Sequence, residues 1–582
     1  MTGPAEAAGR DRSESATGAA PDESIDALLA AAEPAGSRPL GALIDRLAAS
    51  GQLTSIATAG GAPVAEVALR GVTLDSRAVG PGFVFVAVSG AHSNGHDFVA
   101  PAAGLGAAAA LVERPVAGVD IPQVVVADTR RALATAAEWW YGDPSHELGI
   151  VGITGTDGKT TTSFLATALL EASGISTGLI TTAAVKVGAL QTANPEHVTT
   201  PQATQLQQLL RAMAAAGNTA AVVETTSHGL ALERVAEIAY DVAIFTNLTH
   251  EHLELHGTFE AYREAKLSLF RRLGLAAAKQ LPRPWPRTAI VNADDPAAPL
   301  FIEAGRSAGA RVITYGETAA ADVRATGVAE GPRSMRIDVA TPRWSGAVEL
   351  RLAGRFNVYN ALGAIALGEA LELDPAIVRA ALAAVEGVTG RMERIDRGQP
   401  FGVVVDYAHS PASLEKVLDV LAPMAAAAGG GLIAVFGSAG ERDVQKRPMM
   451  GRIAAERCRL VVVTNEDPRG EDEMAIIDQI AAGADAVAGA EAVAGATGAA
   501  TAQPAGPRPE VLRIPDRRAA IEAAFKRARP GDWVLLAGKG HEQTIIMLDG
   551  PVPWDERSEA IRALERLGPE NGASVVRRPG GQ

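Results

Sequence analysis

The loop Gly152–Thr161 combines residue types that bind the phosphates of a nucleotide. It follows a short apolar run and leads into an Ala/Leu-rich helical pattern. Gly155 and Gly158 let backbone N–H groups turn toward phosphate oxygens, because glycine adopts conformations that other residues avoid. Lys159 can reach the β- and γ-phosphates, and Thr160 can hold Mg²⁺. The loop therefore predicts a nucleotide site.

The spacing of this loop departs from the strict phosphate-binding pattern. G-x-x-x-x-G-K-T requires glycine at position 153, where this chain has Ile153 within the variant G-x-x-G-x-x-G-K-T. A glycine-rich turn without a ligand is the structural alternative. A Lys-Thr pair directly after glycine, between a strand and a helix, favours phosphate binding.

Two further segments carry metal-binding residue types. Glu224 ends an apolar run and precedes the polar cluster Thr225–His228, so its carboxylate is placed to bind Mg²⁺ directly or through water. The segment Thr246–His256 holds three histidines spaced by two and four residues. The single cysteine and the many carboxylates favour Mg²⁺ over zinc, and a solvated polar turn is the alternative.

Lys266 has an unusual position for a charged residue. A helix is expected to begin near the N-cap Thr258, and Lys266 lies on its apolar stripe midway between Tyr262 and Phe270. Burying an unpaired ammonium is costly. This cost alone favours an extended lysine side chain whose ammonium reaches water at the edge of the helix. A paired or chemically altered lysine is the alternative.

The elements that must position these residues alternate along the chain. Short apolar runs alternate with Ala/Leu-rich helical patterns, which predicts doubly wound, parallel α/β architecture. Ligands of such sheets bind at the carboxyl ends of the strands, and here nearly every apolar run ends in polar residues. These polar ends are Thr154–Thr160, Glu224–His228, Thr246–His250, Asn292–Asp295, Asp406–His409, Gly437–Gly440, Asn465–Arg469 and Gly538–Glu542.

Shifts in composition mark the two ends of the folded part of the chain and one insertion. Residues 1–39 are rich in Ala, Gly, Ser, Pro and acidic residues, and we expect a mostly disordered extension there with a short helix at Ile25–Ala31. A biased stretch at about 482–508 is expected to be a flexible insertion, and residues from about 568 to 582 a frayed tail. The length of 582 residues indicates three to four domains, or three with tails and insertions.

Charge and cysteine content limit the class of protein. The 582 residues carry 53 Lys and Arg against 67 Asp and Glu, and the net charge of −14 disfavours a general nucleic-acid partner. Cys458 is the only cysteine, so no disulfide framework can form within the chain, and we expect this thiol to be structural. Neither a signal segment nor a run of about 18 strongly apolar residues is present, so no membrane span is expected. We expect a cytoplasmic monomer.

Together with motifs elsewhere, these features resemble the Mur ligase family, most closely its MurE branch, the UDP-N-acetylmuramoyl-tripeptide synthetases. The resemblance covers about residues 68 to 565, outside the biased stretches. So many matches in the same order argue against chance agreement. The matching motifs are Leu74–Arg77, Pro81–Ala87, Thr154–Thr161, Thr199–Pro201, Phe245–Thr249, His256–Gly257, Ala265–Lys266, Gly354–Ala361, Gly390–Arg394, Asp406–His409, Lys446–Pro448 and Gly538–Glu542.

The resemblance implies a three-domain ligase, with domains at 40–146, 147–389 and 390–582. Its N-terminal domain would hold the UDP end of the substrate, its central phosphate-loop domain would bind ATP, and its Rossmann-like C-terminal domain would bind the incoming amino acid. The family activates the D-Glu carboxylate of UDP-MurNAc-L-Ala-D-Glu as an acyl phosphate, which an amine then attacks, in the synthesis of peptidoglycan precursors. Phosphorylation is needed because a free carboxylate is a poor electrophile, and cations stabilise the developing charge.

The resemblance also implies a two-metal site. Thr160 and Glu224 would bind one Mg²⁺, and His252 and Lys266 would bind a second, with Lys266 carbamylated to N6-carboxylysine. A carbamate is an anionic metal ligand, which accounts for a lysine on an apolar stripe and replaces the expectation that it reaches the helix edge. The catalytic residues would be Lys159, Glu224, His252, Lys266 and Arg391.

The remaining carried-over residues fall into three binding sets. ATP would contact Gly155, Thr156, Asp157, Gly158, Lys159, Thr160, Thr161, Asn357, Asn360 and Asp406. UDP-MurNAc-dipeptide would contact Leu74, Ser76, His92, Thr199, Thr200, Thr226 and Arg234. The incoming amino acid would contact Arg442, Asp467, Arg469, Gly538 and Glu542. Leu232 stands where many relatives have Gln for the dipeptide, and Thr226 replaces a usual Ser.

The amino-acid set departs from the family at one decisive position. Members that add meso-diaminopimelate carry D-N-P-R, whereas this chain has E-D-P-R at 466–469. Asp467 replaces an amide that can donate to the far carboxylate of diaminopimelate, and a carboxylate there favours an ammonium instead. Arg442, Arg469 and Glu542 still match the diaminopimelate pattern. We therefore expect meso-diaminopimelate slightly ahead of L-lysine or L-ornithine.

Two rival functions would also account for a nucleotide-binding loop. Another ligase of the family, of the folylpolyglutamate or cyanophycin synthetase kind, would not need Asp75–Arg77, which matches the UDP-substrate motif. A non-catalytic nucleotide-binding scaffold would not need to keep four of the five catalytic positions. Those positions are Lys159, Glu224, His252 and Lys266.

Overall fold

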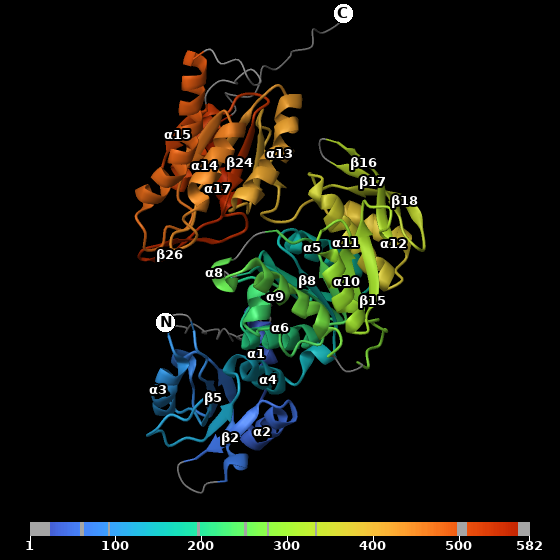
Figure 1. The fold of residues 1–582 in the computed structure, drawn as a ribbon, viewed down its shortest axis with the longest axis vertical. Coiled ribbons are helices and arrows are strands. Elements are labelled where there is room, and N and C mark those ends of the chain that lie inside the picture. Colours follow the sequence, from blue (N-terminus) through green and yellow to red (C-terminus); the bar gives the residue numbers. More distant parts are fainter. Residues whose placement is uncertain are drawn as a thin grey trace, which may run out of the picture.

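A computed structural model describes residues 24–58, 63–90, 93–194, 198–249, 253–275, 279–331, 334–497 and 509–568, with the backbone alone at 253–254 and 488–497. These residues form three α/β domains that follow one another along the long axis, with the N-terminal domain at one end and the C-terminal domain at the other (Figure 1). The predicted fold class is confirmed. Two predicted site residues, His92 and His252, lie outside the described residues.

The N-terminal domain is built on a five-stranded sheet of order β2-β7-β6-β5-β4. Helix α2 (Leu40–Ala49) and helix α4 (Thr129–Tyr141) pack together on one face of it, and helix α3 (Val99–Gly104) packs on the other. The strands are β2 (Leu53–Ala57), β4 (Gly71–Thr73), β5 (Phe83–Val86), β6 (Ala109–Val112) and β7 (Gln123–Val126).

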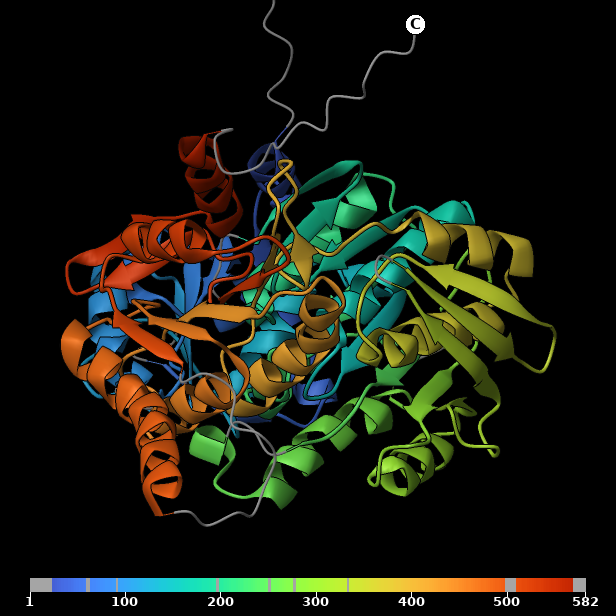
Figure 2. The same cartoon turned by 90° about the horizontal axis from the view of Figure 1, so that it is seen from above.

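The central domain holds an eleven-stranded sheet of order β11-β10-β9-β12-β8-β13-β14-β15-β16-β17-β18. From β9 to β16 in that order, neighbouring strands pair in parallel. Strands β10 and β11 add an antiparallel edge next to β9, and β17 and β18 add one next to β16. Strands β16 to β18 project to one side (Figures 1 and 2). The strands are β8 (Gly149–Thr154), β9 (Thr177–Ile180), β10 (Ala184–Val187), β11 (Leu190–Ala193), β12 (Ala220–Glu224), β13 (Val242–Phe245), β14 (Thr288–Asn292), β15 (Arg311–Gly316), β16 (Val323–Glu330), β17 (Met335–Ala340) and β18 (Ser345–Leu350).

Helices cover both faces of this sheet, which makes it doubly wound. One apolar core lies under α5, α11 and α12, and a second lies under α6, α9 and α10. The helices are α5 (Lys159–Ala172), α6 (Ala203–Ala215), α7 (Ser227–Ala231), α8 (Leu253–His256), α9 (Phe259–Arg272), α10 (Ala298–Ser307), α11 (Phe356–Ala370) and α12 (Pro375–Ala384).

Strand order in the central domain decides which polar residues meet. Strand β8 pairs in parallel with β12 on one side and with β13 on the other, so that Ile153 lies opposite Glu224 and Thr154 opposite Phe245. The phosphate loop after β8 therefore lies between the ends of its two neighbours. The predicted convergence of polar residues at the carboxyl ends of the strands is confirmed here.

The C-terminal domain has a six-stranded sheet of order β19-β20-β24-β21-β22-β23 and a separate hairpin, β25–β26. Apolar cores lie on both faces of the sheet. Its elements are β19 (Glu393–Arg394), β20 (Gly402–Asp406), α13 (Pro411–Ala427), β21 (Leu432–Phe436), α14 (Lys446–Arg457), β22 (Leu460–Val463), α15 (Glu473–Thr497), β23 (Glu510–Arg513), α16 (Arg517–Arg527), β24 (Trp533–Ala537), β25 (Thr544–Met547), β26 (Gly550–Pro553) and α17 (Glu556–Leu567).

The short helix expected at Ile25–Ala31 is confirmed as α1 (Ile25–Ala32), but the chain is ordered from residue 24 onward, so the disorder predicted for the rest of residues 24–39 is wrong. Helix α1 packs beside α6 and joins the central apolar core, and β1 (Arg38–Pro39) pairs with β3 (Ala68–Leu69). Burial of apolar side chains outweighs the polar composition of the segment. Residues 1–23 lie outside the described residues.

The predicted flexible insertion at 482–508 is helical in its first part. Helix α15 continues to Thr497, because alanine has the highest helix propensity and tolerates interspersed glycine in a long helix. Residues 498–508, like the predicted tail from 569 onward, lie outside the described residues. Cys458 is buried as expected, and burial raises the pKa of its thiol to about 12, as befits an inert structural cysteine. Within the described residues, no helix is long and apolar enough to cross a membrane.

Candidate functional site

The phosphate loop has the backbone that its glycines predict. Gly158 has φ +81°, and a Cβ atom there would lie 2.3 Å from Oδ1 of Asn360. At Gly155 a Cβ would lie 1.9 Å from Oγ1 of Thr246, so a side chain fits at neither position. Helix α5 begins at Lys159 and directs its N-terminus at the loop, which suits a bound anion.

Glu224 connects the phosphate loop with two other loops. Its Oε2 accepts a hydrogen bond from Thr160 Oγ1 at 3.0 Å and from the Thr182 backbone N–H at 3.2 Å. Its Oε1 lies 3.3 Å from Thr182 Oγ1. Glu224 is 1% exposed, so the carboxylate stays in place through these contacts. Carboxylate and hydroxyl oxygens are the ligands that Mg²⁺ prefers, and this pair fits one.

Lys266 is buried rather than directed to the helix edge. It is 1% exposed, and its Nζ donates to the backbone oxygen of Gly155 at 2.6 Å. The same nitrogen lies 4.4 Å from the ring centre of Tyr262, whose hydroxyl lies 3.0 Å from Thr156 Oγ1. The expectation of an ammonium at the helix edge is wrong, because a partner is available in the phosphate loop. The partnership with His252 lies outside the described residues.

A cavity of about 1250 Å³ separates the central and C-terminal domains. Most of the predicted nucleotide residues line it together, although they come from three separate stretches of the chain. Cavity-lining residues from the predicted sets are Thr156, Asp157, Gly158, Lys159, Thr160, Thr161, Thr199, Glu224, Thr226, Asn357, Asn360, Arg391 and Asp406.

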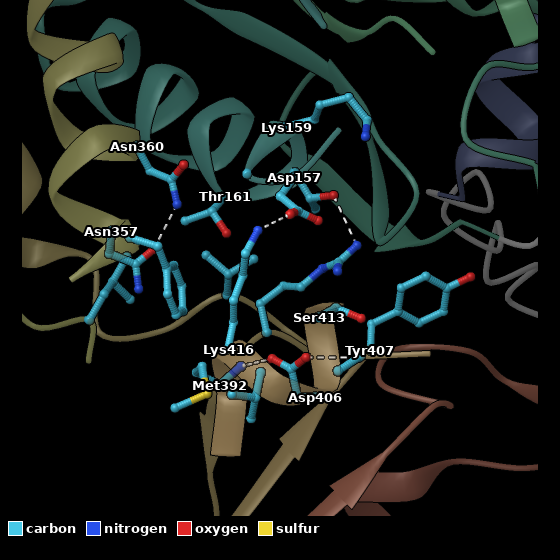
Figure 3. A pocket seen from close by; sticks show the side chains of 18 of the residues that line it. Asp157, Lys159, Thr161, Asn357, Asn360, Met392, Asp406, Tyr407, Ser413 and Lys416 are labelled. Carbon is cyan, nitrogen blue, oxygen red and sulfur yellow. Dashed lines mark hydrogen bonds and ion pairs between the residues drawn. The ribbon is translucent and has the colours of Figure 1, made fainter. Parts of the chain in front are cut away.

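The two sides of the cavity present different groups (Figure 3). On α11, Asn360 Nδ2 donates to Asn357 Oδ1 at 2.8 Å. At the joint between the domains, an Arg391 Nη donates to Thr160 Oγ1 at 3.3 Å, and its Nε is buried without a hydrogen-bond partner among the described residues. Asp406 accepts backbone N–H groups of the C-terminal domain, which fixes its carboxylate at the cavity wall.

Two cationic side chains at this cavity are directed onto the phosphate loop itself. Lys159 Nζ donates to the backbone oxygen of Thr156 at 2.8 Å. Lys416 Nζ, from α13 of the C-terminal domain, lies 2.5 Å from Asp157 Oδ2 (Figure 3). Lys416 was missed in the sequence, because nothing in the pattern of an amphipathic helix marks one exposed lysine as functional.

The predicted dipeptide residues of the central domain form a single network beside Glu224. Thr200 Oγ1 donates to the Glu224 backbone oxygen at 3.0 Å and lies 3.0 Å from Thr226 Oγ1. Thr182 Oγ1 donates to Thr199 Oγ1 at 2.8 Å. An Arg234 Nη donates to the Thr200 backbone oxygen at 2.9 Å. Thr200 therefore lies one hydrogen bond away from Glu224, whose side chain in turn accepts from Thr160 of the phosphate loop.

Arg234 is only partly satisfied in this network. Its Nε is buried without a hydrogen-bond partner among the described residues. Burial, and then the nearby charge of Arg130, lower the pKa of Arg234. Leu74 and Ser76, predicted for the same substrate, lie in the N-terminal domain and do not line the cavity.

The predicted amino-acid residues gather around a lysine that was not predicted. Lys539 is fully buried, and its Nζ lies 2.7 Å from Asp467 Oδ1 and 2.5 Å from Glu542 Oε2. Oε2 of neighbouring Glu466 is buried without a hydrogen-bond partner among the described residues. Burial opposes a charge on Lys539, but the two carboxylates raise its pKa above the ordinary value. Its place inside the matched motif Gly538–Glu542 was the available signal.

The other predicted amino-acid residues are Arg469, Gly538 and Arg442. Arg469 has φ +56°, and its backbone N–H donates to the Ile546 oxygen at 3.0 Å, while its Nε is buried without a hydrogen-bond partner among the described residues. Gly538 has φ +102°, and a Cβ there would lie 2.9 Å from Glu466 Oε2. Arg442 is exposed. None of the predicted amino-acid residues lines the cavity that holds the phosphate loop.

Comparisons with known proteins agree with this three-part layout. Family profiles match in chain order: "Mur ligase family, catalytic domain" at residues 68–141, "Mur ligase middle domain" at 153–368, and "Mur ligase, glutamate ligase domain" at 390–540. The chain is 47% identical over 512 residues to a UDP-N-acetylmuramyl-tripeptide synthetase of Roseiflexus sp. (strain RS-1), covering 87% of this chain and 96% of that protein.

Two further relatives extend the comparison. A UDP-N-acetylmuramoyl-L-alanyl-D-glutamate–2,6-diaminopimelate ligase of Geobacillus kaustophilus (strain HTA426) is 38% identical over 495 residues, covering 85% of this chain and 94% of that protein. A solved structure of a UDP-N-acetylmuramoyl-L-alanyl-D-glutamate–2,6-diaminopimelate ligase is 29% identical with a TM-score of 0.58, covering 88% of this chain and 97% of that one. Both matches span all three domains.

Proposed function

The chain belongs to the Mur ligase family, and on that premise we propose that it joins a diamino acid to UDP-MurNAc-L-Ala-D-Glu at the expense of ATP. The observation that carries the proposal is the position of Glu224. Its side chain accepts from Thr160 of the phosphate loop, and its backbone oxygen accepts from Thr200 of the proposed dipeptide set. A nucleotide phosphate and an acceptor carboxylate bound by these groups would be neighbours.

The proposed reaction has two steps. An oxygen of the D-Glu carboxylate attacks the γ-phosphorus, the bond to the β-phosphate oxygen breaks, and ADP leaves. The amine of the diamino acid then attacks the acyl carbon, phosphate leaves, and the amine nitrogen loses a proton to form the amide. Lys159 and Arg391 stabilise the negative charge that develops on the phosphoryl oxygens. Mg²⁺ held by Thr160 and Glu224 would neutralise phosphate charge as a Lewis acid.

We further propose that Lys266 acts as a carbamate. The ammonium first loses a proton. The neutral Nζ then adds to the carbon of CO₂ and the adduct loses a second proton, so that an anion replaces the buried ammonium. The support is its burial beside the Gly155 carbonyl, in the loop that holds the phosphates. A carbamate oxygen is a hard ligand suited to a second Mg²⁺, with His252 as the proposed partner.

The observations point to different diamino acids. The name of the Geobacillus relative specifies diaminopimelate, whereas that of the Roseiflexus relative leaves the amino acid open. Arg469, with a buried Nε, suits a carboxylate, whereas buried Glu466 and Asp467 suit an ammonium. We propose meso-diaminopimelate as the preferred substrate, with L-lysine or L-ornithine as the alternative.

The test is to offer the three diamino acids separately with ATP, Mg²⁺ and UDP-MurNAc-dipeptide, and to identify the product by mass spectrometry. We expect the largest kcat/KM with diaminopimelate. A larger kcat/KM with lysine or ornithine would reverse the choice of amino acid. Failure of all three, with folded protein, would contradict the proposed function itself.

Asp467→Asn is expected to shift this preference further toward diaminopimelate. The amide keeps an oxygen for Lys539 and for the Ile546 N–H, which both bind Oδ1 of Asp467, and adds a donor for a substrate carboxylate. The ratio of kcat/KM for diaminopimelate over lysine should rise about tenfold, the effect of one hydrogen bond to a charged group. Asp443→Asn, an exposed carboxylate of the same domain, is the matched control and should leave the ratio unchanged.

A further inference from the structure

Lys416 is a cation that the proposed chemistry has not yet used. It lies on α13 and lines the cavity between the central and C-terminal domains. Its Nζ lies 2.5 Å from Oδ2 of Asp157, in the middle of the phosphate loop, and the two residues are 259 positions apart in the chain. The contact therefore joins the C-terminal domain directly to the nucleotide site.

Asp157 is an unusual residue to find at the centre of a phosphate-binding loop, because its charge repels phosphate. Burial alone would raise its pKa, but Lys416, Lys159 and Arg391 hold that pKa below the ordinary value. Three cations therefore act on one carboxylate. Only Lys416 makes a direct ion pair with it. The carboxylate of Asp157 is therefore the anion that faces these three cations in the structure.

The ion pair is weak enough for Lys416 to exchange the Asp157 carboxylate for a phosphate. Both side chains are partly exposed, 46% for Lys416 and 38% for Asp157, and such pairs contribute little to stability because water screens them. A triphosphate carries several charges and offers many acceptor oxygens to a single ammonium. Lysine serves as a compact point charge on a flexible stem, so a small change of rotamer can redirect it.

We propose that Lys416 is a phosphate ligand of the bound nucleotide, supplied by the C-terminal domain, and that Asp157 holds it in place until nucleotide arrives. Nucleotide binding then breaks the Lys416–Asp157 pair and replaces it with a Lys416–phosphate contact. This inference rests on the nucleotide binding of the proposed function. It adds Lys416 as a phosphate ligand and Asp157 as a residue that competes with the phosphates for Lys416.

The alternative is a permanent latch in which the ion pair only fixes the two domains. The two accounts predict different signs. If Asp157 competes with phosphate, Lys416→Ala weakens nucleotide binding and Asp157→Asn strengthens it. If the pair is a latch, both substitutions remove the same contact and change the affinity in the same direction.

The experiment is calorimetric titration of the full chain with a non-hydrolysable ATP analogue, ADP and AMP, in Mg²⁺ and without the other substrates. Lys416→Ala should raise the Kd of the ATP analogue about tenfold, consistent with loss of a charge-assisted contact, and change the Kd of AMP less. Lys416→Arg should restore most of the affinity, and Asp157→Asn should lower the Kd. Lys526→Ala, which removes an exposed lysine of α16, is the control for net charge and should match the wild type.

Three results would overturn the proposal: an unchanged Kd in Lys416→Ala, a raised or unchanged Kd in Asp157→Asn, or equal losses for AMP and the ATP analogue. Failure of the proposed function looks different. In that case the wild type itself would bind none of the three nucleotides, whereas failure of the Lys416 inference leaves wild-type binding intact.

Discussion

Replacing Lys266 by alanine is expected to lower the kcat of amide formation about 10³-fold, because the substitution removes a proposed anionic metal ligand from the phosphoryl-transfer site. The measurement is steady-state ADP formation at saturating substrates. Small carboxylates such as acetate should restore part of the rate by occupying the space that the side chain leaves. Wild-type turnover in Lys266→Ala would exclude the proposed role.

A matched variant separates chemistry from packing. Lys266 is 1% exposed, so alanine leaves a hole in the core, whereas Lys266→Met fills it without an amine. The methionine variant should be equally inactive, and acetate should not rescue it. Nuclear magnetic resonance with ¹³C-bicarbonate gives a readout independent of activity: a carbamate carbon signal in the wild type that is absent from Lys266→Met. A wild type without that signal, under conditions where it is active, would contradict carbamylation.

Glu224→Gln is expected to lower kcat about 10²- to 10³-fold and to raise the Mg²⁺ concentration needed for half-maximal activity. Glutamine keeps an oxygen for the Thr160 hydroxyl, so the fold of the loop is preserved, but it removes the negative charge next to that hydroxyl. The measurement is a Mg²⁺ titration of ADP formation.

Glu171→Gln is the control for this charge change. Glu171 lies on the same helix as Thr160 but pairs with Lys186 away from the cavity, so its Mg²⁺ dependence should equal that of the wild type. If Glu224→Gln shows the wild-type Mg²⁺ dependence, the proposed role of Glu224 as a metal ligand is wrong.

The nucleotide loop could be predicted because its information is local. Glycine spacing after a strand dictates the backbone, and the positive φ of Gly158 together with the close approach of Asn360 bears this out. Glu224 followed from the same reasoning, since parallel strands bring their carboxyl ends to one edge.

Partners that lie far away in the chain could not be predicted. The carbonyl that receives Lys266 Nζ belongs to Gly155, 111 residues away, so the helix stripe alone suggested the wrong place for the ammonium. Lys416 has the same difficulty across a domain boundary. Around Asp467, the sequence showed a lost amide but not that Lys539 neutralises the new carboxylate, 72 residues away.

Predictions from amino-acid composition were partly wrong in two segments whose structure depends on packing or helix propensity. The polar extension before residue 40 was expected to be mostly disordered around one short helix, yet that helix, α1, joins the central apolar core through Ile25 and Ala32, and the chain after it is ordered as well. The Ala/Gly-rich stretch after residue 482 was expected to be a loop, yet the α15 helix continues through its first part. In both segments, burial or helix propensity outweighs a composition that is typical of flexible chains.

The central claim is that one site couples ATP cleavage to joining a diamino acid to UDP-MurNAc-dipeptide. The most direct test is to measure sustained ADP release by the wild type while omitting the dipeptide substrate and the diamino acid in turn. The account predicts sustained release only when both are present, with one ADP for each tripeptide formed. ADP release that continues at the same rate without the dipeptide substrate or without any diamino acid would contradict it.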